Sequence, residues 1–374
     1  MDNKNICILT FPISKSGITP LSNLVDILYL LSNNLYLITG NEGYIFFKDY
    51  KKIHAYGIDH RSGKSSIETI GKYILTQVKM SYLILKLRNK IDIYVLFFGC
   101  EGLLLPVLTI KLLKKKVISI PADYTIKFDR DKLSQTLRYL SNITRMISDR
   151  IILYSPNLIT EWELSKYKNK VSIGHEHILD FNRFKLEKKY SDRELVIGYI
   201  GRFSEEKGII NFIESIPLIL KEKPHLNVLI IGDGDLKNDI QMYLLRNGLE
   251  NNVKLMGWIC HEHLPTHLNS LKLLVLPSYI EGLPNIMLEA MACGTSVLAT
   301  KVGAIPDIII ENETGFLMEN NSPECIAKNV IRVLDRPDLD SVAYNARTLV
   351  NTEYTYKNAI ENYKIILAGL TRLN

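Results

Sequence analysis

The most informative segment of this chain is Leu273-Leu-Val-Leu-Pro277, followed closely by Glu281-Gly-Leu-Pro-Asn-Ile-Met-Leu-Glu289. The apolar run predicts a buried strand, and the residues after Pro284 predict a helix that Gly294 ends. Pro284 suits the first helical position, where its missing N–H costs nothing. We therefore expect Glu281 in the loop at the carboxyl end of the strand, and Glu289 about one turn into the helix.

The two carboxylates are separated by seven residues, and both can face one crevice together with the N-terminal amides of the helix. That crevice is where an α/β sheet binds anionic ligands. Carboxylates repel phosphate, but they bind sugar hydroxyls well. A ligand that carries both phosphate and sugar satisfies both requirements, so the stretch predicts a nucleotide-sugar site.

A second charged loop follows an earlier predicted strand, Leu195–Gly201. Arg202 and Lys207 lie in this loop, before a predicted helix over Ile209–Lys221. A guanidinium clamps phosphate oxygens bidentately and an ammonium adds a compact charge, so the pair could neutralise a diphosphate. A solvated charged loop is the alternative for this segment alone. The two glutamates about eighty residues later make the phosphate interpretation the stronger one.

Five motifs follow one another along the chain, namely Gly201–Gly208, Ile231–Asp235, Gly257-Trp258, Glu281–Gly294 and Gly303–Asp307. In this order they resemble the retaining GT-B glycosyltransferase family, whose hallmark is the Glu-x7-Glu pair. The resemblance covers essentially the whole C-terminal half, whereas the N-terminal half fits only in layout. It implies an α/β fold of two Rossmann-like, doubly wound parallel-sheet domains facing a central cleft.

The resemblance also implies roles for individual residues. Arg202 and Lys207 would neutralise the leaving diphosphate, Glu281 would hold donor-sugar hydroxyls beside the anomeric carbon, and Glu289 would bind the ribose hydroxyls. No metal and no cofactor is expected, because two cationic side chains and a helix terminus replace the metal. The further substrate-binding candidates are Leu283, Asn285, Ile286, Gly17, Gly232 and Trp258.

The N-terminal half departs from the family pattern at two places. The loop Pro12–Pro20 carries one glycine, Gly17, where the family has a pair; Gly17 admits a close approach of phosphate, but a plain turn explains it equally well. The family also tends to place a histidine after the strand that corresponds to Lys116–Ile120. This chain has Asp123 there, which is a partial match and a candidate for binding a sugar hydroxyl or an acceptor.

Two short motifs imitate metal sites. His261-Glu-His263-Leu-Pro-Thr-His267 lacks the His-Glu-x-x-His spacing because residue 265 is proline. Asp233-Gly-Asp235 follows the predicted strand Asn227–Ile231 and precedes a helix, so N-capping is its simpler role. Gly232 and Gly234 form only part of a dinucleotide fingerprint, so no dinucleotide cofactor is expected.

A length of 374 residues and alternating strand and helix patterns predict two domains with parallel sheets. We expect residues 1–188 to bind the acceptor, residues 189–354 to bind the nucleotide sugar, and the helix in residues 355–374 to pack back on the first domain. The charged segment Leu186–Glu194 is expected to be an exposed linker. Strands are expected in the first half at 6–11, 35–39, 53–58, 91–98, 116–120 and 150–154.

Charge divides the chain into a basic and an acidic half. Residues 1–190 hold 29 Lys and Arg against 17 Asp and Glu, a balance of +12; the rest holds 17 against 23, a balance of −6, which recovers the net +6. Nucleic acid is not an expected partner, because its sequence signatures are missing. An anionic membrane surface suits the basic half, with helices at 65–88 or 132–148, and solvated surface lysines are the alternative. Five scattered cysteines and the lack of a secretory signal indicate a cytoplasmic protein. If the basic half does bind a membrane, the protein would be peripheral on the inner face of the cell membrane.

The resemblance implies a retaining hexosyltransferase-type enzyme. It would move a sugar from a nucleotide diphosphate sugar, with a UDP-sugar favoured, to a glycan or lipid-linked glycan acceptor in polysaccharide or glycoconjugate synthesis. A nucleotide-sugar 2-epimerase and a non-catalytic nucleotide-sugar-binding protein are the alternatives. An oxidoreductase is least favoured, since the dinucleotide fingerprint is incomplete.

Overall fold

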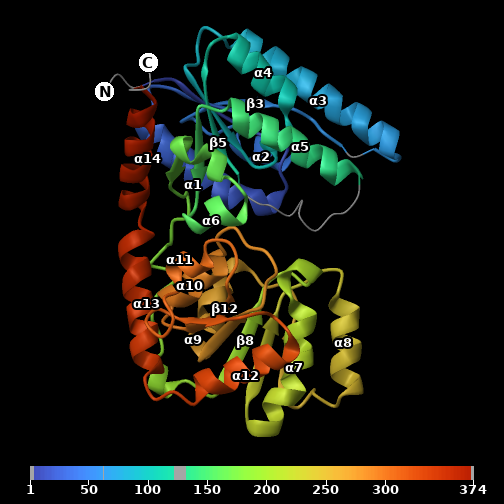
Figure 1. Cartoon of the computed structure of the whole chain (residues 1–374), viewed down its shortest axis with the longest axis vertical. Coiled ribbons are helices and arrows are strands. Elements are labelled where there is room, and N and C mark those ends of the chain that lie inside the picture. Colours follow the sequence, from blue (N-terminus) through green and yellow to red (C-terminus); the bar gives the residue numbers. More distant parts are fainter. Residues whose placement is uncertain (1–3, 62, 122–131, 372–374) are drawn as a thin grey trace. The chain divides into compact units, whose positions relative to one another are not determined.

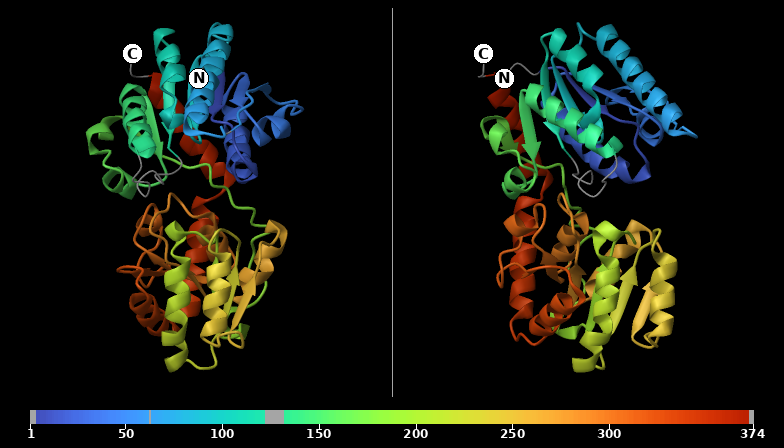
Figure 2. Two further views of the ribbon diagram at one scale, coloured as in Figure 1. Left: turned by 90° about the vertical axis from the view of Figure 1, so that its right-hand side faces the viewer. Right: turned by 45° about the vertical axis from the view of Figure 1, so that its right-hand side comes forward.

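The computed structural model describes residues 4–61, 63–121 and 132–371. The chain forms two compact units, of which unit 1 comprises Met1–Ile178 with Tyr356–Asn374, and unit 2 comprises Leu179–Thr355. Each unit is a parallel sheet with helices packed against it (Figures 1 and 2). The two Rossmann-like, parallel-sheet domains expected from the sequence are therefore confirmed.

Unit 1 is built on seven parallel strands in the order β3-β2-β1-β4-β5-β6-β7. Its strands are β1 (Ile6–Thr10), β2 (Leu35–Thr39), β3 (His54–Gly57), β4 (Ile93–Phe97), β5 (Lys116–Ile120), β6 (Arg150–Leu153) and β7 (Val171–Ile173). Its helices are α1 (Ile18–Leu31), α2 (Glu42–Phe47), α3 (Ser66–Lys86), α4 (Leu104–Leu112), α5 (Lys132–Ile147), α6 (Asn157–Glu161) and α14 (Tyr356–Thr371).

The central strands of unit 1 are apolar along their whole length. Strands β1, β2 and β4 are buried at every position, which is typical of parallel strands covered by helices on both faces. The sequence predicts β2 and β5 with the observed bounds. It does not predict β7, a three-residue edge strand without a fully buried position, because so short a half-exposed run has no distinctive pattern.

Helix α14 belongs to unit 1, although it follows unit 2 in the sequence. It lies against α1, and the Tyr356 hydroxyl donates a hydrogen bond to the Asp26 carbonyl oxygen at 3.1 Å. Ala359, Tyr363 and Ile366 are buried on its inner face. Unit 1 is therefore discontinuous in sequence, and its last helix is contributed by residues that come after all of unit 2.

Unit 2 contains six parallel strands in the order β10-β9-β8-β11-β12-β13. Its strands are β8 (Val196–Ile200), β9 (Asn227–Ile231), β10 (Val253–Met256), β11 (Leu273–Leu276), β12 (Ser296–Thr300) and β13 (Phe316–Met318). Its helices are α7 (Ile209–Glu222), α8 (Lys237–Arg246), α9 (Leu264–Ser270), α10 (Asn285–Ala292), α11 (Ile305–Ile308), α12 (Pro323–Leu334) and α13 (Leu339–Glu353).

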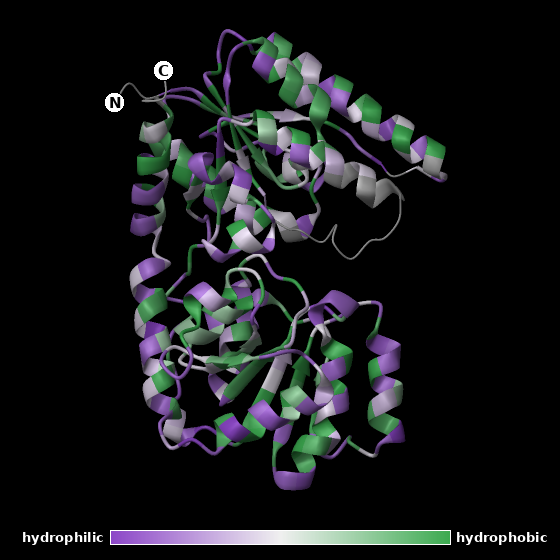
Figure 3. Cartoon of the chain, viewed as in Figure 1, coloured by the Kyte–Doolittle hydropathy of each residue, from purple (hydrophilic) through white to green (hydrophobic). Residues whose placement is uncertain are grey.

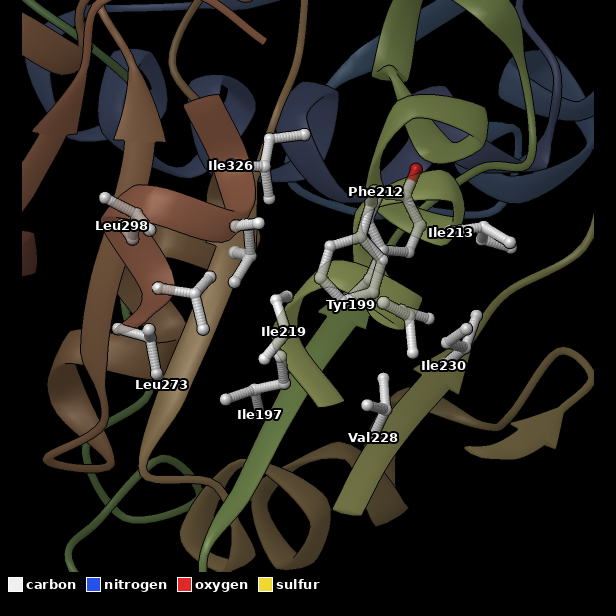
Figure 4. Packing of buried hydrophobic residues seen from close by; sticks show 14 of the residues in the cluster. Ile197, Tyr199, Phe212, Ile213, Ile219, Val228, Ile230, Leu273, Leu298 and Ile326 are labelled. Carbon is white, nitrogen blue, oxygen red and sulfur yellow. The ribbon is translucent and has the colours of Figure 1, made fainter. Parts of the chain in front are cut away.

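The core of unit 2 lies between this sheet and helices α7 and α12. Alternate strand residues point into it, as the two-residue period of a strand requires; Ile197 and Tyr199 of β8 are the central pair (Figure 4). The Tyr199 ring stacks on that of Phe212 of α7, with 5.8 Å between ring centroids. Ile326 of α12 completes the cluster. This packing fixes the carboxyl ends of β8, β9 and β11 relative to one another.

Most of the segment Leu186–Glu194 is exposed, as the sequence predicts, but the segment lies within unit 2 and is anchored there through Arg193. Arg193 is buried, and its guanidinium donates to the carbonyl oxygens of Leu271 at 2.8 Å and Cys293 at 2.7 Å. It also donates to Thr295 Oγ1 at 2.8 Å. Burial lowers the pKa of Arg193 to about 10. The guanidinium also donates to Lys188 O at 3.2 Å, so this one buried arginine satisfies four polar atoms of the unit, which charge composition does not predict.

Among the described residues, none of the helices has both the length and the apolar character needed to span a bilayer.

Candidate functional site

The sheet order of unit 2 defines where a ligand can bind. Strand β8 lies between β9 and β11, because the chain builds the sheet outward from β8 first on one side and then on the other. Such a reversal leaves a crevice at the carboxyl ends of the strands, and open α/β sheets bind their ligands there. The loops that follow β8, β9 and β11 form this edge of unit 2.

The loops after β8 and β9 are joined through their backbones. Phe203 N donates to Asp233 O at 2.9 Å, and Leu236 N donates to Phe203 O at 3.2 Å. Gly232 has φ +154°, and a Cβ at this position would lie 1.9 Å from Gly201 O. Only glycine permits this approach, so Gly232 serves first to bring the two loops together.

The loop after β8 also meets the loop after β11. Gly208 has φ +67°, and a Cβ there would lie 2.0 Å from Pro277 O. Tyr279 N donates to Glu206 O at 2.9 Å. The three loops therefore form one continuous rim, although they are far apart in sequence.

Arg202 lies on this rim with its guanidinium largely in solvent. Its backbone is fixed, since the Tyr199 hydroxyl donates to Arg202 O at 2.8 Å. Its side chain is 68% exposed, and Nη1 lies 3.4 Å from Glu206 Oε1. Burial opposes ionisation of Glu206, but the Ser204 hydroxyl at 2.7 Å and the Arg202 charge hold the pKa of this carboxyl below its ordinary value. Most of the guanidinium donors remain available to an anion.

Lys207 and Glu281 form an ion pair across the two motifs. Lys207 Nζ donates to Glu281 Oε1 at 2.8 Å, and the Ser278 hydroxyl donates to the same oxygen at 2.7 Å. Glu281 is buried and Lys207 is partly buried. Among the described residues none donates to Oε2 of Glu281. The carboxylate is therefore oriented by two donors and keeps one oxygen for a further partner.

Helix α10 begins directly after this loop. Its N-cap is Pro284, so the expectation that Pro284 takes the first helical position is wrong by one residue; Asn285 takes it instead. The amides of Asn285 and Ile286 belong to the first turn, where a helix has no partner of its own for them. Asn285 is exposed and Ile286 half-buried, whereas the Leu283 side chain is buried. A ligand would therefore meet Leu283 through its backbone.

A neighbouring loop supports the turn that carries Glu281. Ala304 N donates to Gly282 O at 2.8 Å. Gly303 has φ +62°, and a Cβ there would lie 2.2 Å from Glu281 O. The glycine of the Gly303–Asp307 motif thus acts by packing against the backbone beneath Glu281.

Glu289 is hydrogen-bonded to His261, a residue of the motif that imitates a metal site. His261 Nε2 lies 2.7 Å from Glu289 Oε1, and Arg183 Nη1 lies 3.3 Å from His261 Nδ1. The hydrogen bond and the charge of Glu289 raise the pKa of His261, against the effect of its partial burial. The only sequence feature that could have indicated this role is the position of His261, which follows β10 in the same loop as Trp258.

A pocket of about 360 Å³ opens at this edge of unit 2. Its lining includes Arg202, Gly232, Trp258 and His261. Trp258 is 72% exposed, so its indole offers a free face. Lys207, Glu281 and Glu289 are not among the described residues lining this pocket. Two of these three residues are neighbours of lining residues. Lys207 lies in the same loop after β8 as Arg202, and Glu289 is hydrogen-bonded to His261.

The two predicted site residues of unit 1 are placed differently. Gly17 ends a short 3-10 turn, Lys15–Gly17, and precedes α1 with an ordinary φ of −82°. A Cβ at Gly17 would lie 3.2 Å from Ile13 Cβ, so local packing accounts for a small residue there. Asp123 lies outside the described residues.

The expected N-capping role of Asp233 and Asp235 is wrong. Helix α8 begins at Lys237, and its N-cap is Leu236. Asp233 instead accepts from Gly234 N at 2.9 Å and pairs with Lys237 at 3.3 Å, which stabilises the turn itself. Among the described residues, His, Cys, Asp and Glu side chains do not gather in groups of three that could hold a metal ion.

Comparison with known proteins agrees with this geometry. Residues 180–348 match the model of the family described as Glycosyl transferases group 1. An uncharacterized glycosyltransferase of Methanocaldococcus jannaschii is 28% identical over 248 residues, covering 64% of each chain. The capsular polysaccharide biosynthesis glycosyltransferase CapM of Staphylococcus aureus is 29% identical over 204 residues, covering 50% of this chain and 52% of that protein. The chain thus spans between about half and two thirds of the length of these relatives.

A solved structure extends the likeness to the whole chain. Anabaena HepE, crystallised in complex with UDP, superposes with a TM-score of 0.77 over 97% of this chain and 99% of that one. The sequence identity is 17%, so this likeness concerns the fold. The chain therefore has the GT-B fold of two Rossmann-like domains, and its residues 180–348, which hold Arg202, Lys207, Glu281 and Glu289, match the family of glycosyl transferases group 1.

Proposed function

We propose that this chain is a retaining glycosyltransferase that uses a nucleotide diphosphate sugar, with a UDP-sugar favoured. The observation that carries the proposal is the convergence of Arg202, Gly232 and Trp258 on one pocket, at the edge where Lys207 pairs with Glu281. The family match of unit 2 supports transfer from a nucleotide sugar. UDP bound to HepE, a protein of the same fold, favours uridine as the base.

The diphosphate would bind between Arg202 and Lys207. The exposed Arg202 guanidinium can grip two phosphate oxygens, and Lys207 keeps two N–H donors after the one that it gives to Glu281. The first amides of α10, at Asn285 and Ile286, add the positive end of the helix dipole. Together these groups supply the charge stabilisation that a metal ion would otherwise give.

The sugar and the nucleoside would be held by the two carboxylates and the pocket wall. Oε2 of Glu281 can accept from a donor-sugar hydroxyl, because the two hydrogen bonds from protein donors use Oε1. Glu289 would accept from the ribose hydroxyls, with His261 as its neighbour. The exposed indole of Trp258 offers a stacking surface for the base.

The reaction would retain the anomeric configuration. The acceptor oxygen bonds to the anomeric carbon on the face from which the diphosphate leaves, and the leaving diphosphate oxygen takes the acceptor proton. The barrier then falls chiefly through stabilisation of the departing negative charge, for which Arg202 and Lys207 are placed.

Unit 1 would bind the acceptor, a glycan or lipid-linked glycan in polysaccharide or glycoconjugate synthesis. The match to CapM, a capsular polysaccharide biosynthesis glycosyltransferase, supports this class of product. The basic balance of residues 1–190 supports a peripheral position on an anionic membrane surface. Asp123 remains the proposed acceptor-side or sugar-side residue of this unit, in place of the family histidine.

The test of the donor site is thermal melting of the whole chain with UDP, GDP, ADP and their sugar conjugates. A ligand at about 100 times its dissociation constant should add roughly 2.7 kcal/mol to the free energy of unfolding. We expect selective stabilisation by one base, lost in Glu289→Ala and kept in Glu214→Ala, an exposed carboxylate of α7. The lack of any response to nucleotides would remove the basis for the proposed site.

The reaction itself is tested by incubation with the stabilising nucleotide sugar. Transfer to an added glycan, with an α-linked donor giving an α-linked product by NMR, is the expected result. Conversion of the sugar without any acceptor would identify an epimerase instead. Nucleotide-sugar binding without turnover of either kind would identify a binding protein.

A further inference from the structure

Helix α3 exposes an apolar side to solvent, whereas an ordinary surface helix exposes a polar one. A row of large apolar side chains repeats every three or four residues along the side that faces away from the sheet. The row consists of Ile67, Ile70, Ile74, Val78, Tyr82 and Leu85, which are between 45% and 84% exposed. Spacing of this kind produces one continuous apolar stripe on a helix.

The opposite side of α3, which packs on unit 1, carries polar residues with defined partners. Thr76 is buried and its hydroxyl lies 2.8 Å from His60 Nδ1. Gln77 is buried and its Oε1 accepts from Leu105 N at 3.1 Å, at the start of α4. Because the helix is already anchored by these contacts and by Met80 and Ile84, the outer stripe is not needed to hold it in place.

Helix α4 extends the apolar surface beside α3. The two helices pack against each other, and Figures 1 and 3 show them side by side with apolar residues along both. Leu105, Leu108 and Leu112 of α4 are exposed, the last to 83%. We call the six residues of α3 and these three leucines the apolar face. Nine exposed large apolar side chains on two helices that pack together mark an interaction site rather than scattered exposure.

The surroundings of the apolar face are basic. Residues 66–116 hold nine Lys and Arg against three Asp and Glu, a balance of +6. Glu68 is one of the three acids, and it is paired with Lys72 at 2.6 Å. Lys79 and Lys86 are exposed on α3 next to the stripe. A second copy of this chain docking face to face would bring like charges together, whereas an anionic lipid surface would neutralise them.

We propose that the apolar face is a membrane-docking surface, with α3 and α4 lying in the plane of an anionic bilayer. The apolar side chains enter the boundary between headgroups and acyl chains, and Lys79 and Lys86 remain at the level of the headgroups. Attachment of this kind needs no membrane-spanning helix. It places unit 1, the unit proposed to bind the acceptor, against the bilayer.

The test is flotation of the whole chain with vesicles of phosphatidylcholine alone or mixed with phosphatidylglycerol. We expect binding to the anionic vesicles that weakens at high salt, because the lysine contribution is screened. Ile74→Ser with Val78→Ser should lower the partition coefficient by about tenfold per side chain. Lys79→Gln should lower it about fivefold. The control is Leu245→Ser on α8, which removes an even more exposed apolar side chain from unit 2 and should bind as the parent does.

The outcomes separate this proposal from the proposed enzyme activity. UDP binding by unit 2 should be unchanged in the α3 variants, so loss of flotation with retained UDP binding supports docking through the apolar face. Equal flotation of the parent and the Ile74→Ser, Val78→Ser variant would overturn the proposal. So would a parent that does not bind anionic vesicles, or one that is a dimer which the same variant dissociates.

Discussion

Lys207 Nζ lies 2.8 Å from Oε1 of Glu281, so the cation of one motif neutralises the carboxylate of another that is 74 residues away in sequence. Both side chains are at least partly buried, and the Ser278 hydroxyl completes the arrangement at 2.7 Å. The pair explains how a carboxylate can sit beside a phosphate site. Its charge is already balanced before a diphosphate arrives.

This pair should behave as one unit under mutation. Lys207→Ala leaves a buried carboxylate without its cation, and Glu281→Ala leaves a partly buried ammonium. The double variant should therefore lose less stability than the sum of the losses in the two single variants. The difference, which is the coupling free energy, should be about 1–3 kcal/mol. Thermal or urea unfolding of the four proteins measures this coupling. Additive effects of the two substitutions would show that the contact does not bind the motifs together.

The proposed phosphate clamp predicts a loss of rate. Arg202→Ala or Lys207→Ala should lower kcat by roughly 10²–10³-fold, because each removes a donor to the leaving diphosphate. Lys221→Ala serves as the matched control, since it removes an exposed lysine at the far end of α7. Initial rates with saturating UDP-sugar give kcat for the parent, the two clamp variants and the control. Near-parental rates in both clamp variants would argue that the diphosphate binds elsewhere.

The two glutamates should fail in different ways. Glu289→Ala should chiefly weaken UDP binding, because its proposed partner is the ribose, whereas Glu281→Ala should chiefly lower kcat, because its partner is the transferred sugar. Calorimetric titration with UDP and steady-state rates with UDP-sugar separate the two effects. The opposite pattern would mean that the roles of Glu281 and Glu289 are exchanged.

The contact between His261 and Glu289 predicts a pH-dependent contribution to stability. The folded-state pKa of His261 is raised by Glu289 above the ordinary value of about 6.5. Its stabilising effect is therefore fully present below about pH 6.5 and is lost as the pH rises through the raised pKa. The melting temperature of the parent should exceed that of His261→Gln at acidic pH, and the difference should shrink at alkaline pH. A difference independent of pH would assign His261 a packing role only.

The glycine at 232 should be intolerant of any side chain. A Cβ there would lie 1.9 Å from Gly201 O, so Gly232→Ala must push apart the loops after β8 and β9. We expect a loss of about 2–3 kcal/mol in the free energy of unfolding, together with weaker UDP binding. Gly71→Ala is the control, because a Cβ on that residue of α3 meets nothing within 4 Å and should be neutral or stabilising. Equal behaviour of the two variants would show that the loop contact is dispensable.

Local pattern predicts most of the fold and the positions of the charged residues. Buried parallel strands are continuous apolar runs, so β2, β5 and β9 have the bounds that the sequence predicts. Strand ends followed by charged loops then place Arg202, Lys207 and Glu281 at one sheet edge. Those features depend only on residues close together in the chain.

Pairings between distant residues are not encoded in such patterns. The contact of His261 with Glu289 spans 28 residues, and in the sequence His261 belongs only to a motif that imitates a metal site without its spacing. Arg193 likewise looks solvated by composition, yet it bonds to Leu271 and Cys293 deep in unit 2. Each depends on tertiary packing, which decides whether a charged side chain meets water or a protein carbonyl.

The discontinuity of unit 1 has a consequence for how the chain is made. Helix α14, which covers α1, is translated only after the 177 residues of Leu179–Thr355. At about 5–20 residues per second, a ribosome needs roughly 9–35 s to synthesise that insertion. Throughout this interval the surface of unit 1 that later receives Tyr363 and Ile366 is exposed on a nascent chain. Synthesis of α14, rather than synthesis of the sheet, is therefore the event that allows unit 1 to become complete.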